Sequence, residues 1–471
     1  MPASNANKEE RIRGFVIAAT KSGSGKTTVS LGLMAALKRR GMAVAPFKVG
    51  PDFIDPGHHT KITGRISRNL DGWMLPPDYN RDCYQQAAAG AEIAVVEGVM
   101  GLYDGYDGKS EAGSTAQMAK LIDLPVVLVV DAASMARSAA ALVQGFENFD
   151  PALQFAGVIF NNLGSPGHLQ YLTDALIDNV RMLCLGGILR SDQVTIPERH
   201  LGLVTEDEHI LTAERESRLA DLVEVHVQID RLLECLDDHE TPTVTGTGSR
   251  PDQQVRIGLA RDKAFCFYYQ DNLELLEAAG AQVVQFSPIE DRSLPPDLDG
   301  LYLGGGYPEL SARALSENTG MRTDIRNQSR QGLPVYAECG GFMYLCSALT
   351  DQKGGTYPMV GCFPFQTRMS PRLRALGYRE ITLSRDTIIG TAGQVIRGHE
   401  FHYSALEEDT EIDMETVYTV TKRAGRQKQA GGFQVNQTLG SYTHLHFGSC
   451  PAVADAFIST CRIYRHERNQ V

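Results

Sequence analysis

The sequence Arg13-Gly-Phe-Val-Ile-Ala-Ala-Thr-Lys-Ser-Gly-Ser-Gly-Lys-Thr-Thr28 joins an apolar run to a glycine-rich loop and the start of a helix. The apolar run predicts a strand, and the helical spacing of residues 29–40 predicts a helix that Gly41 ends. This order is the context of a phosphate-binding loop, in which backbone N–H groups face the phosphates and the lysine reaches them. The Thr27 hydroxyl would hold Mg²⁺. The predicted nucleotide-binding residues are Gly23, Gly25, Lys26, Thr27 and Thr28.

The loop departs from the standard phosphate-binding pattern at its first position. Thr20 stands where that pattern has glycine, and dethiobiotin-synthetase-like enzymes share this variation. Lys21 stands where the related deviant P-loop ATPases carry a second lysine. The loop therefore looks like a variant of these two groups.

Two aspartates follow the next apolar run, residues 43–49. Asp52 and Asp55 lie in a segment bounded by glycine and proline, which we expect at the carboxyl end of a strand. Open α/β sheets bind their ligands at that edge. The two side chains would contact Mg²⁺ or the substrate, and the alternative is that they only stabilise turns beside the prolines.

Further carboxylates come after the strand predicted for residues 92–97. Glu97 ends that strand, where P-loop enzymes hold Mg²⁺ or its water, so we predict it as a metal ligand together with Thr27. Asp104 and Asp107 follow as further carboxylates in a flexible, glycine-rich loop. Asn161 and Asn162 end a later strand, and their amides are candidates to contact a nucleobase.

Strands and helices alternate along the first half, and the strands are apolar without alternation. This pattern predicts a parallel sheet covered by helices on both faces. Residues 237–254 have almost no apolar content and many turn formers, which is typical of a linker. We therefore predict an α/β fold with a P-loop domain over residues 1–236, a linker over 237–254 and a second α/β domain over 255–471.

Composition excludes several classes of protein. The net charge of −12 argues against a general nucleic-acid binder. No long apolar run predicts a membrane span, and the polar first residues do not resemble a secretory signal. Nine dispersed cysteines without a CxxC pair are typical of a reducing, cytoplasmic environment.

A cysteine stands at a sharp turn in the second half, in the segment Leu333-Pro-Val-Tyr-Ala-Glu-Cys-Gly-Gly-Phe-Met-Tyr344. The apolar run predicts a strand that ends at Cys339, and the two glycines allow a tight entry into a helix. A thiol at a helix N-terminus is favoured as a thiolate. By itself the segment also fits a buried structural cysteine.

Other parts of the second half could complete a site around this thiol. Gly304, Gly305 and Gly306 end another predicted strand, where backbone N–H groups can form an oxyanion hole. A cysteine nucleophile needs a base, and histidine has a suitable pKa. The candidates are His399, His402, His444 and His446, and alternation along the chain puts the last two on one face of a strand.

Taken together, these stretches resemble the cobyrinate a,c-diamide synthase family over nearly the whole chain. The matching segments are residues 20–28, 48–56, 97–105, 304–309, 337–341, 398–404 and 442–447. The family joins a dethiobiotin-synthetase-like ATPase domain to a class I glutamine amidotransferase domain. The resemblance implies L-glutamine, ATP with Mg²⁺ and a polycarboxylate tetrapyrrole as reactants, no membrane or nucleic-acid partner, and it allows a homodimer.

The resemblance also implies roles for individual residues. Cys339 attacks the glutamine amide and releases ammonia, and His444 is its base, with His446 as the alternative. The oxyanion donors would be Gly305, Gly306 and Gly340. ATP would phosphorylate a carboxylate of the substrate, and ammonia would then displace phosphate. The residues of this synthetase site are Asp52, Asp55, Glu97 and Asp104.

Three other interpretations remain at this point. The same chemistry could amidate sirohydrochlorin or Ni-sirohydrochlorin instead of cobyrinate. Cobyric acid synthase uses the same two domains on four carboxylates, although residues 51–56 and 444–447 favour the a,c-diamide branch. A different class of protein, a P-loop ATPase binding module with an inactive amidotransferase domain, is disfavoured by the presence of Cys339 and both late histidines.

Overall fold

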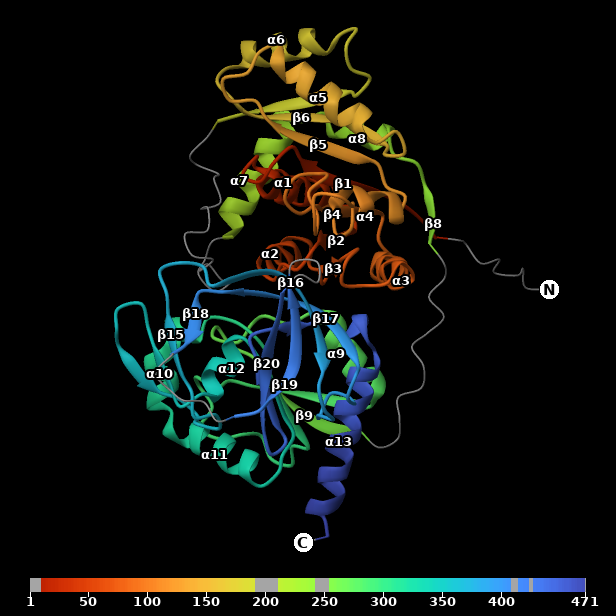
Figure 1. Cartoon of the computed structure of the whole chain (residues 1–471). Coiled ribbons are helices and arrows are strands. Elements are labelled where there is room, and N and C mark those ends of the chain that lie inside the picture. Colours follow the sequence, from red (N-terminus) through yellow and green to blue (C-terminus); the bar gives the residue numbers. More distant parts are fainter. Residues whose placement is uncertain (1–9, 191–210, 242–253, 408–413, 423–426, 471) are drawn as a thin grey trace, which may run out of the picture. The chain divides into compact units, whose positions relative to one another are not determined.

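A computed structural model describes residues 10–190, 211–241, 254–407, 414–422 and 427–470. The chain divides into two compact units, one ending at Gly246 and the other beginning at Thr247, apart from a short segment of residues 199–203 outside the described residues. Figure 1 shows their helices and strands. Among the described residues, no helix has the length and apolar content needed to cross a membrane.

A parallel sheet forms the centre of the first unit, with strand order β3-β2-β4-β1-β5-β6-β7. Strands β2 and β4 are buried along their whole length, as expected for a sheet with helices on both faces. The parallel strands are β1 (Glu10–Ala19), β2 (Val44–Val49), β3 (Arg68–Leu70), β4 (Ile93–Glu97), β5 (Val126–Asp131), β6 (Phe155–Leu163) and β7 (Cys184–Leu189).

Helices cover this sheet in two layers because successive side chains of β1 point to opposite faces. Phe15 and Ile17 pack in one apolar core, and Val16 packs in the other. The core with Phe15 includes side chains of α1 (Lys26–Arg39), α2 (Ile54–Thr63), α7 (Ala213–His226) and α8 (Ile229–Glu234). The core with Val16 includes side chains of α3 (Pro77–Ala88), α4 (Thr115–Leu121), α5 (Ser138–Phe149) and α6 (Pro166–Leu176).

A short strand lies at the start of the segment predicted as a linker. Strand β8 (His239–Thr241) pairs antiparallel with the beginning of β1, at Glu10–Ile12. The remainder of that segment, residues 242–253, lies outside the described residues.

The second unit has a ten-stranded mixed sheet, with strand order β10-β9-β11-β12-β21-β20-β19-β16-β17-β22. Its parallel half contains β9 (Val255–Ala260), β10 (Ala281–Phe286), β11 (Gly300–Leu303), β12 (Val335–Glu338) and β21 (Thr438–Ser441). Its antiparallel half adds β16 (Ala375–Leu383), β17 (Val395–His402), β19 (Thr416–Lys422), β20 (Gln427–Val435) and β22 (His444–Leu445). The predicted α/β fold class is confirmed, and the antiparallel half is a feature that the sequence pattern did not predict.

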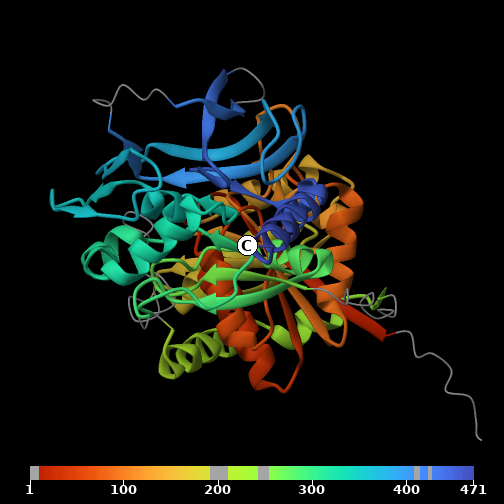
Figure 2. The ribbon, with the colours of Figure 1, turned by 90° about the horizontal axis from the view of Figure 1, so that it is seen from below.

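Helices and a second sheet complete this unit. Helices α9 (Gln270–Ala279) and α13 (Ala452–Arg468) lie side by side (Figure 2). The Arg462 guanidinium of α13 donates to the Ala279 carbonyl of α9 at 2.8 Å. The other helices are α10 (Ala312–Glu317), α11 (Thr319–Arg330) and α12 (Gly340–Leu345), with 3₁₀ turns η2 (Pro308–Ser311) and η3 (Phe447–Ser449). The second sheet contains β13 (Ala348–Thr350), β14 (Thr356–Pro358), β15 (Gln366–Met369) and β18 (Ser404–Leu406).

The close packing of α1 on α7 gives a prediction about stability. A Cβ atom added at Gly32 would lie 2.5 Å from Val223 Cγ2 and 3.0 Å from the Leu219 carbonyl oxygen. Gly32→Ala should therefore lower the free energy of unfolding by about 1 kcal/mol, because overpacking outweighs the better helix propensity of alanine. Gly145 of α5 has no atom within 4 Å of such a Cβ, so Gly145→Ala should instead stabilise. Denaturant midpoints of both variants test this, and equal midpoints would contradict it.

Candidate active sites

The glycine-rich loop between β1 and α1 is held in place by β6. Gly25 precedes α1 with φ of 86°, and a Cβ atom there would lie 2.0 Å from the Asn161 amide nitrogen. That amide donates to the Ser24 carbonyl at 2.9 Å. Asn162 donates to Asp131 at 3.0 Å. Both amides that the sequence offered for contact with a nucleobase therefore have protein partners, and Asn161 supports the loop.

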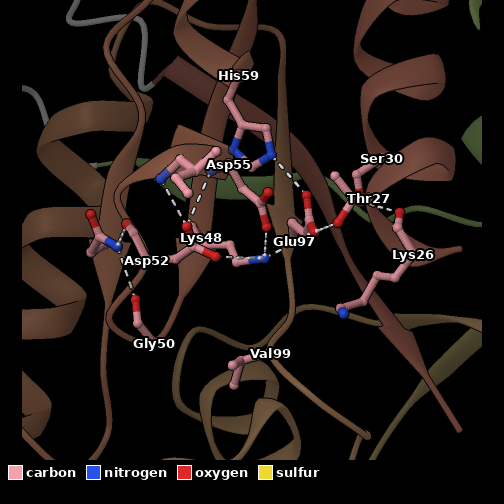
Figure 3. Close-up of polar contacts among 12 residues, drawn as sticks. Lys26, Thr27, Ser30, Lys48, Gly50, Asp52, Asp55, His59, Glu97 and Val99 are labelled. Atoms are coloured by element: carbon pink, nitrogen blue, oxygen red, sulfur yellow. Dashed lines mark hydrogen bonds and ion pairs between the residues drawn. The ribbon is translucent and has the colours of Figure 1, made fainter. Parts of the chain in front are cut away.

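A cluster of charged side chains lies beside the start of α1 (Figure 3). The Lys48 ammonium of β2 donates to Asp55 at 2.5 Å and to Glu97 at 2.9 Å. The Thr27 hydroxyl donates to the same Glu97 oxygen at 2.7 Å. His59 Nε2 lies 2.8 Å from the other oxygen of Glu97. Strands β2 and β4 and helices α1 and α2 thus bring five side chains to one point.

Burial makes the charges of this cluster depend on one another. Burial alone would lower the pKa of Lys48, but Asp55, Glu97 and Asp52 outweigh it and raise that pKa. Burial alone would raise the pKa of Glu97, but Lys48 and His59 bring it well below its usual range. The pKa of Lys26 is lowered by burial and by the neighbouring Lys48. At neutral pH the cluster therefore holds an ammonium group between two ionised carboxylates.

The two remaining predicted aspartates occupy different surroundings. Asp52 Oδ1 accepts from the N–H groups of Ile54 and Asp55 at the start of α2, and Oδ2 lies 3.9 Å from Lys48 Nζ. Asp52 thus stabilises a turn and also faces the cluster. Asp104 is exposed and accepts from the Gly101 N–H at 3.0 Å. The structure brings Asp52 to Asp55 and Glu97, and it places Asp104 on the loop that follows β4.

Two members of the cluster, Lys48 and His59, had no role in the sequence interpretation. Lys48 is a charged residue inside an otherwise apolar strand, and such a residue needs buried partners. The position of Lys48 within an apolar strand was therefore the feature of the sequence from which a buried charge cluster could have been predicted. His59 is fully buried between Glu97 and Ser67, and nothing in the sequence distinguishes it from a structural histidine.

The oxygen atoms present here fit Mg²⁺ that arrives with a nucleotide. Within the parts of the chain that the structure describes, no set of three or more His, Cys, Asp or Glu side chains is arranged to hold a metal ion. The Thr27 hydroxyl and the Glu97 carboxylate are nevertheless the hard oxygen ligands that Mg²⁺ prefers, and they lie in direct contact. Phosphate oxygens and water would have to supply the other ligands.

In the second unit, Cys339 lies at a strained turn between β12 and α12. Its φ of 46° is unusual for a residue other than glycine, and its N–H donates to the Ser441 carbonyl at 2.8 Å. Only 6% of the residue is exposed. Strain of this kind is often found at nucleophiles that are held at the entry to a helix.

His444 of β22 lies beside this thiol. Its ring forms a hydrogen bond with the Cys339 side chain, and its Nδ1 lies 3.8 Å from Glu338 Oε2. Burial alone would lower the pKa of His444, but Cys339 and Glu338 raise it to about 10. A Cβ atom at Gly305 would lie 2.2 Å from His444 Cε1, so glycine at that position makes room for the ring.

The other three histidines have different partners. His446 Nε2 lies 3.5 Å from Asp271, and burial lowers the pKa of His446 to about 3. His399 Nδ1 lies 2.8 Å from the Tyr269 hydroxyl. His402 Nδ1 lies 2.8 Å from the Ser404 carbonyl. Of the four candidates, His444 is the one that the structure places against Cys339 through a hydrogen bond.

The three glycines expected to bind the oxyanion are not equivalent. The Gly305 N–H donates to the Phe267 carbonyl at 3.2 Å, so it cannot also serve as an oxyanion donor without breaking that bond. Within the described residues, the N–H groups of Gly306 and Gly340 have no hydrogen-bond acceptor. A Cβ atom at Gly340 would lie 3.0 Å from the Gly306 nitrogen, which places these two donors near each other and next to Cys339. The prediction for Gly305 needs this correction, since its contribution is space for His444.

The buried cluster of the first unit gives a prediction with a pH dependence. Lys48→Met should destabilise by about 3–5 kcal/mol near neutral pH, because Asp55 and Glu97 lose their cation. In the wild type the lowered pKa of Glu97 contributes stability above its unfolded pKa, and that contribution is lost as the pH falls through the folded pKa. The penalty of Lys48→Met should therefore shrink towards about pH 4, where the orphaned carboxylates become protonated. Denaturant unfolding of the wild type and of Lys48→Met at several pH values measures this penalty in the free energy of unfolding.

A lysine in a more exposed ion pair provides the matched control. Lys120 contacts Glu111 and Asp150, each at 2.6 Å, with a quarter of its side chain exposed. Lys120→Met should cost about 1 kcal/mol or less at every pH. Equal penalties for the two variants would show that the Lys48 cluster is not a buried charge network.

The contrast between His444 and His446 gives a prediction about thiol reactivity. His444→Ala removes the cation beside Cys339, so the pH midpoint for alkylation of Cys339 should rise by about one unit or more. His446→Ala should leave that midpoint unchanged, because His446 is neutral and faces Asp271. Iodoacetamide labelling followed by peptide mass spectrometry measures Cys339 separately from the other cysteines. A midpoint that moves in His446→Ala and not in His444→Ala would reverse the assignment.

Family models match both units. Residues 15–204 match the CobQ/CobB/MinD/ParA nucleotide binding domain, and residues 256–452 match the CobB/CobQ-like glutamine amidotransferase domain. The first match covers the glycine-rich loop and the Lys48 cluster. The second match covers Cys339 and His444.

Curated relatives match nearly the whole chain. The cobyrinate a,c-diamide synthase of Syntrophotalea carbinolica is 47% identical over 95% of this chain and 98% of its own length. The enzyme of the same name from Salmonella typhimurium is 43% identical over 96% of this chain and 99% of its own length. One from Methanosarcina acetivorans is 43% identical over 97% of both chains. The chain therefore belongs to the cobyrinate a,c-diamide synthase family of glutamine-hydrolysing ligases.

Proposed function

We propose that this chain amidates the a and c side-chain carboxylates of cobyrinate, with ATP as the energy source and glutamine as the source of ammonia. The observation that carries the proposal is the presence of two complementary sites in one chain. One has a phosphate-binding loop with Thr27 against Glu97, and the other has Cys339 against His444. The names of the relatives support the substrate.

Glutamine hydrolysis would take place at Cys339. The Cys339 sulfur attacks the side-chain amide carbon, and His444 passes a proton to the departing nitrogen, so that ammonia leaves and a thioester forms. The N–H groups of Gly306 and Gly340 stabilise the oxyanion in this step. Water then attacks the thioester, with His444 as the base, and glutamate is released.

Carboxylate activation would take place at the phosphate-binding loop. A carboxylate is a poor electrophile because its negative charge repels nucleophiles. A tetrapyrrole carboxylate oxygen therefore attacks the γ-phosphorus of ATP, and ADP leaves. Ammonia then attacks the acyl phosphate carbon, and phosphate leaves as the amide forms. Lys26 and the loop N–H groups bind the phosphates and stabilise their charge in this scheme.

The side chains around Glu97 would prepare the site for ATP. Bound Mg²⁺ would neutralise phosphate charge, and Thr27 and Glu97 would hold it. Lys48 and His59 keep Glu97 ionised and oriented before the nucleotide arrives. Asp52 and Asp55 face the same cluster and would orient the metal or the substrate. Asp104, on its exposed loop, would likewise orient the metal or the substrate.

The substrate is tested by incubating the enzyme with ATP, Mg²⁺, glutamine and one tetrapyrrole at a time. Cobyrinate, hydrogenobyrinate, sirohydrochlorin and Ni-sirohydrochlorin form the panel, and mass spectrometry counts the amides formed. We expect two amides on cobyrinate. Two amides on sirohydrochlorin alone would move the assignment to that substrate. Four amides on cobyrinate would indicate cobyric acid synthase activity, and no product on any tetrapyrrole would refute the proposal.

Two variants separate the sites. Cys339→Ser should lose glutamine-dependent amidation by about 10³-fold or more and keep amidation from ammonium salts. Lys26→Ala should lose amidation from either nitrogen source and keep glutamine hydrolysis. Loss of ammonium-dependent synthesis in a folded Cys339→Ser variant would contradict the assignment of glutamine hydrolysis and carboxylate activation to two separate sites.

A further inference from the structure

We propose that Glu338, the residue immediately before the nucleophile, is the positioning acid for His444. This inference rests on the proposed glutaminase reaction and adds a third member to its pair of reacting side chains. The acid would come from strand β12, which also presents Cys339, and not from the segment that follows His444. The first acidic residue after His444 in the sequence is Asp455, in α13.

The Glu338 carboxylate is buried and hydrogen-bonded on both oxygens. Oε2 lies 3.8 Å from His444 Nδ1 and accepts from the Tyr302 hydroxyl at 3.1 Å. Oε1 accepts from the Tyr336 hydroxyl at 2.6 Å and from the Leu445 N–H at 3.0 Å. Because Leu445 follows His444 directly, one carboxylate contacts both the ring and the backbone of β22. That arrangement restricts the position and the rotation of the imidazole.

The surrounding groups keep Glu338 available as an acceptor. Burial, and then Glu338 itself, raise the pKa values of Tyr302 and Tyr336 well above the usual range, so both phenols remain donors. Glu338 is 1% exposed. A carboxylate buried to this extent is costly unless a cation faces it, and the protonated form of His444 provides that cation.

Other buried acids in this unit have different partners. Glu400 accepts from the Arg379 guanidinium at 2.8 Å and from the Thr443 hydroxyl at 3.0 Å. Asp271 lies 3.5 Å from His446 Nε2. Neither is shown to contact the His444 ring, although Glu400 contacts the residue next to it. Glu338 is therefore the acid whose position fits an orienting role.

The titratable groups that face His444 come from two strands, β12 and β17. The β12 segment contributes Glu338 and the adjoining Cys339. Strand β17 contributes His399, whose ring stacks on His444 with centroids 4.9 Å apart, and His402, whose pKa burial lowers to about 4. A His402 ring with that pKa is neutral in the working range. Among the described residues, the acidic groups beside His444 are thus Cys339 and Glu338, and Glu338 remains when the thiol is consumed in the thioester.

This persistence gives Glu338 a distinct function in the reaction. While the thioester exists, Cys339 carries no charge, and His444 must still take a proton from the attacking water. Glu338 stabilises the resulting imidazolium and holds Nδ1 towards itself, which directs Nε2 to the reacting atoms. Loss of its charge should therefore slow turnover and leave the binding of glutamine unchanged.

The test is Glu338→Gln in the full chain, which keeps the shape of the side chain and removes its charge. We expect the glutaminase kcat to fall about 10- to 100-fold, with KM for glutamine within about two-fold of the wild type. Histidine NMR titration in the free enzyme should show the pKa of His444 moving down from its value of about 10. Ammonium-dependent amidation should be unchanged. An unchanged kcat and an unchanged His444 titration would overturn the proposal.

Glu400→Gln is the matched control, because it is the same exchange at a buried carboxylate next to β22. Glu400→Gln should lower the melting temperature and leave the pKa of His444 unchanged. An equal shift of His444 in both variants would also overturn the proposal. If Glu338→Gln does not fold, Glu338→Asp is the second variant. It keeps the negative charge but places the carboxylate farther from the His444 ring. In that variant we expect a lower kcat with a His444 that still titrates high, and a wild-type kcat would count against a positioning role.

These measurements also separate this inference from the proposed function. A wild-type enzyme without glutaminase activity would refute the proposed glutamine reaction. The NMR titration would still report whether Glu338 interacts with His444. A fully active wild type with an unaffected Glu338→Gln variant would refute only the inference about Glu338.

Discussion

A charge buried in a protein has to be neutralised by partners inside the protein, and both sites of this chain depend on that constraint. In the first unit, the Lys48 ammonium is neutralised by Asp55 and Glu97. In the second unit, the cation that can form on His444 faces Cys339 and Glu338. At each site, neighbouring groups of opposite charge lower the free-energy cost of burying the ion. The charged group can therefore stay in the interior and take part in the reaction.

Strand register brings these partners together. Lys48 and Glu97 are register partners in the parallel pair β2–β4, so the pairing of two apolar strands delivers an ammonium to a carboxylate. In the second unit, Glu338 pairs with Ser441 across β12–β21, and His444 pairs with His399 across β17–β22. The chain therefore reaches β22 close to the end of β12, where Cys339 stands. A shift of one residue in either register would turn the functional side chains to the wrong face.

The two sites are adapted to different chemistry. The site in the first unit presents hydroxyl and carboxylate oxygens and two lysines, which suit phosphates and Mg²⁺. The site in the second unit presents a thiol on a strained turn, an imidazole and the N–H groups of Gly306 and Gly340, which suit attack on an amide and stabilisation of its oxyanion. Glycine at Gly305 illustrates how closely this second site is packed, because any side chain there would collide with His444.

By itself, the sequence determined the features that depend on local order along the chain. The alternation of apolar runs and helical segments predicted the α/β class, and the loop from Thr20 to Thr28 predicted the phosphate-binding turn, because a turn is encoded by the residues within it. The same holds for the turn at Cys339. The antiparallel half of the ten-stranded sheet in the second unit was not predicted, because strand pairing joins segments that are far apart in sequence.

Only the tertiary structure decided which distant side chains meet. His444 and His446 are two residues apart and similar in sequence context, yet one contacts Cys339 and the other faces Asp271. Lys48, His59 and Glu338 acquire their partners from other strands and helices, and Gly305 commits its N–H to Phe267. These contacts depend on strand register and on the packing of segments many residues apart, and neither is encoded in any short stretch of the chain.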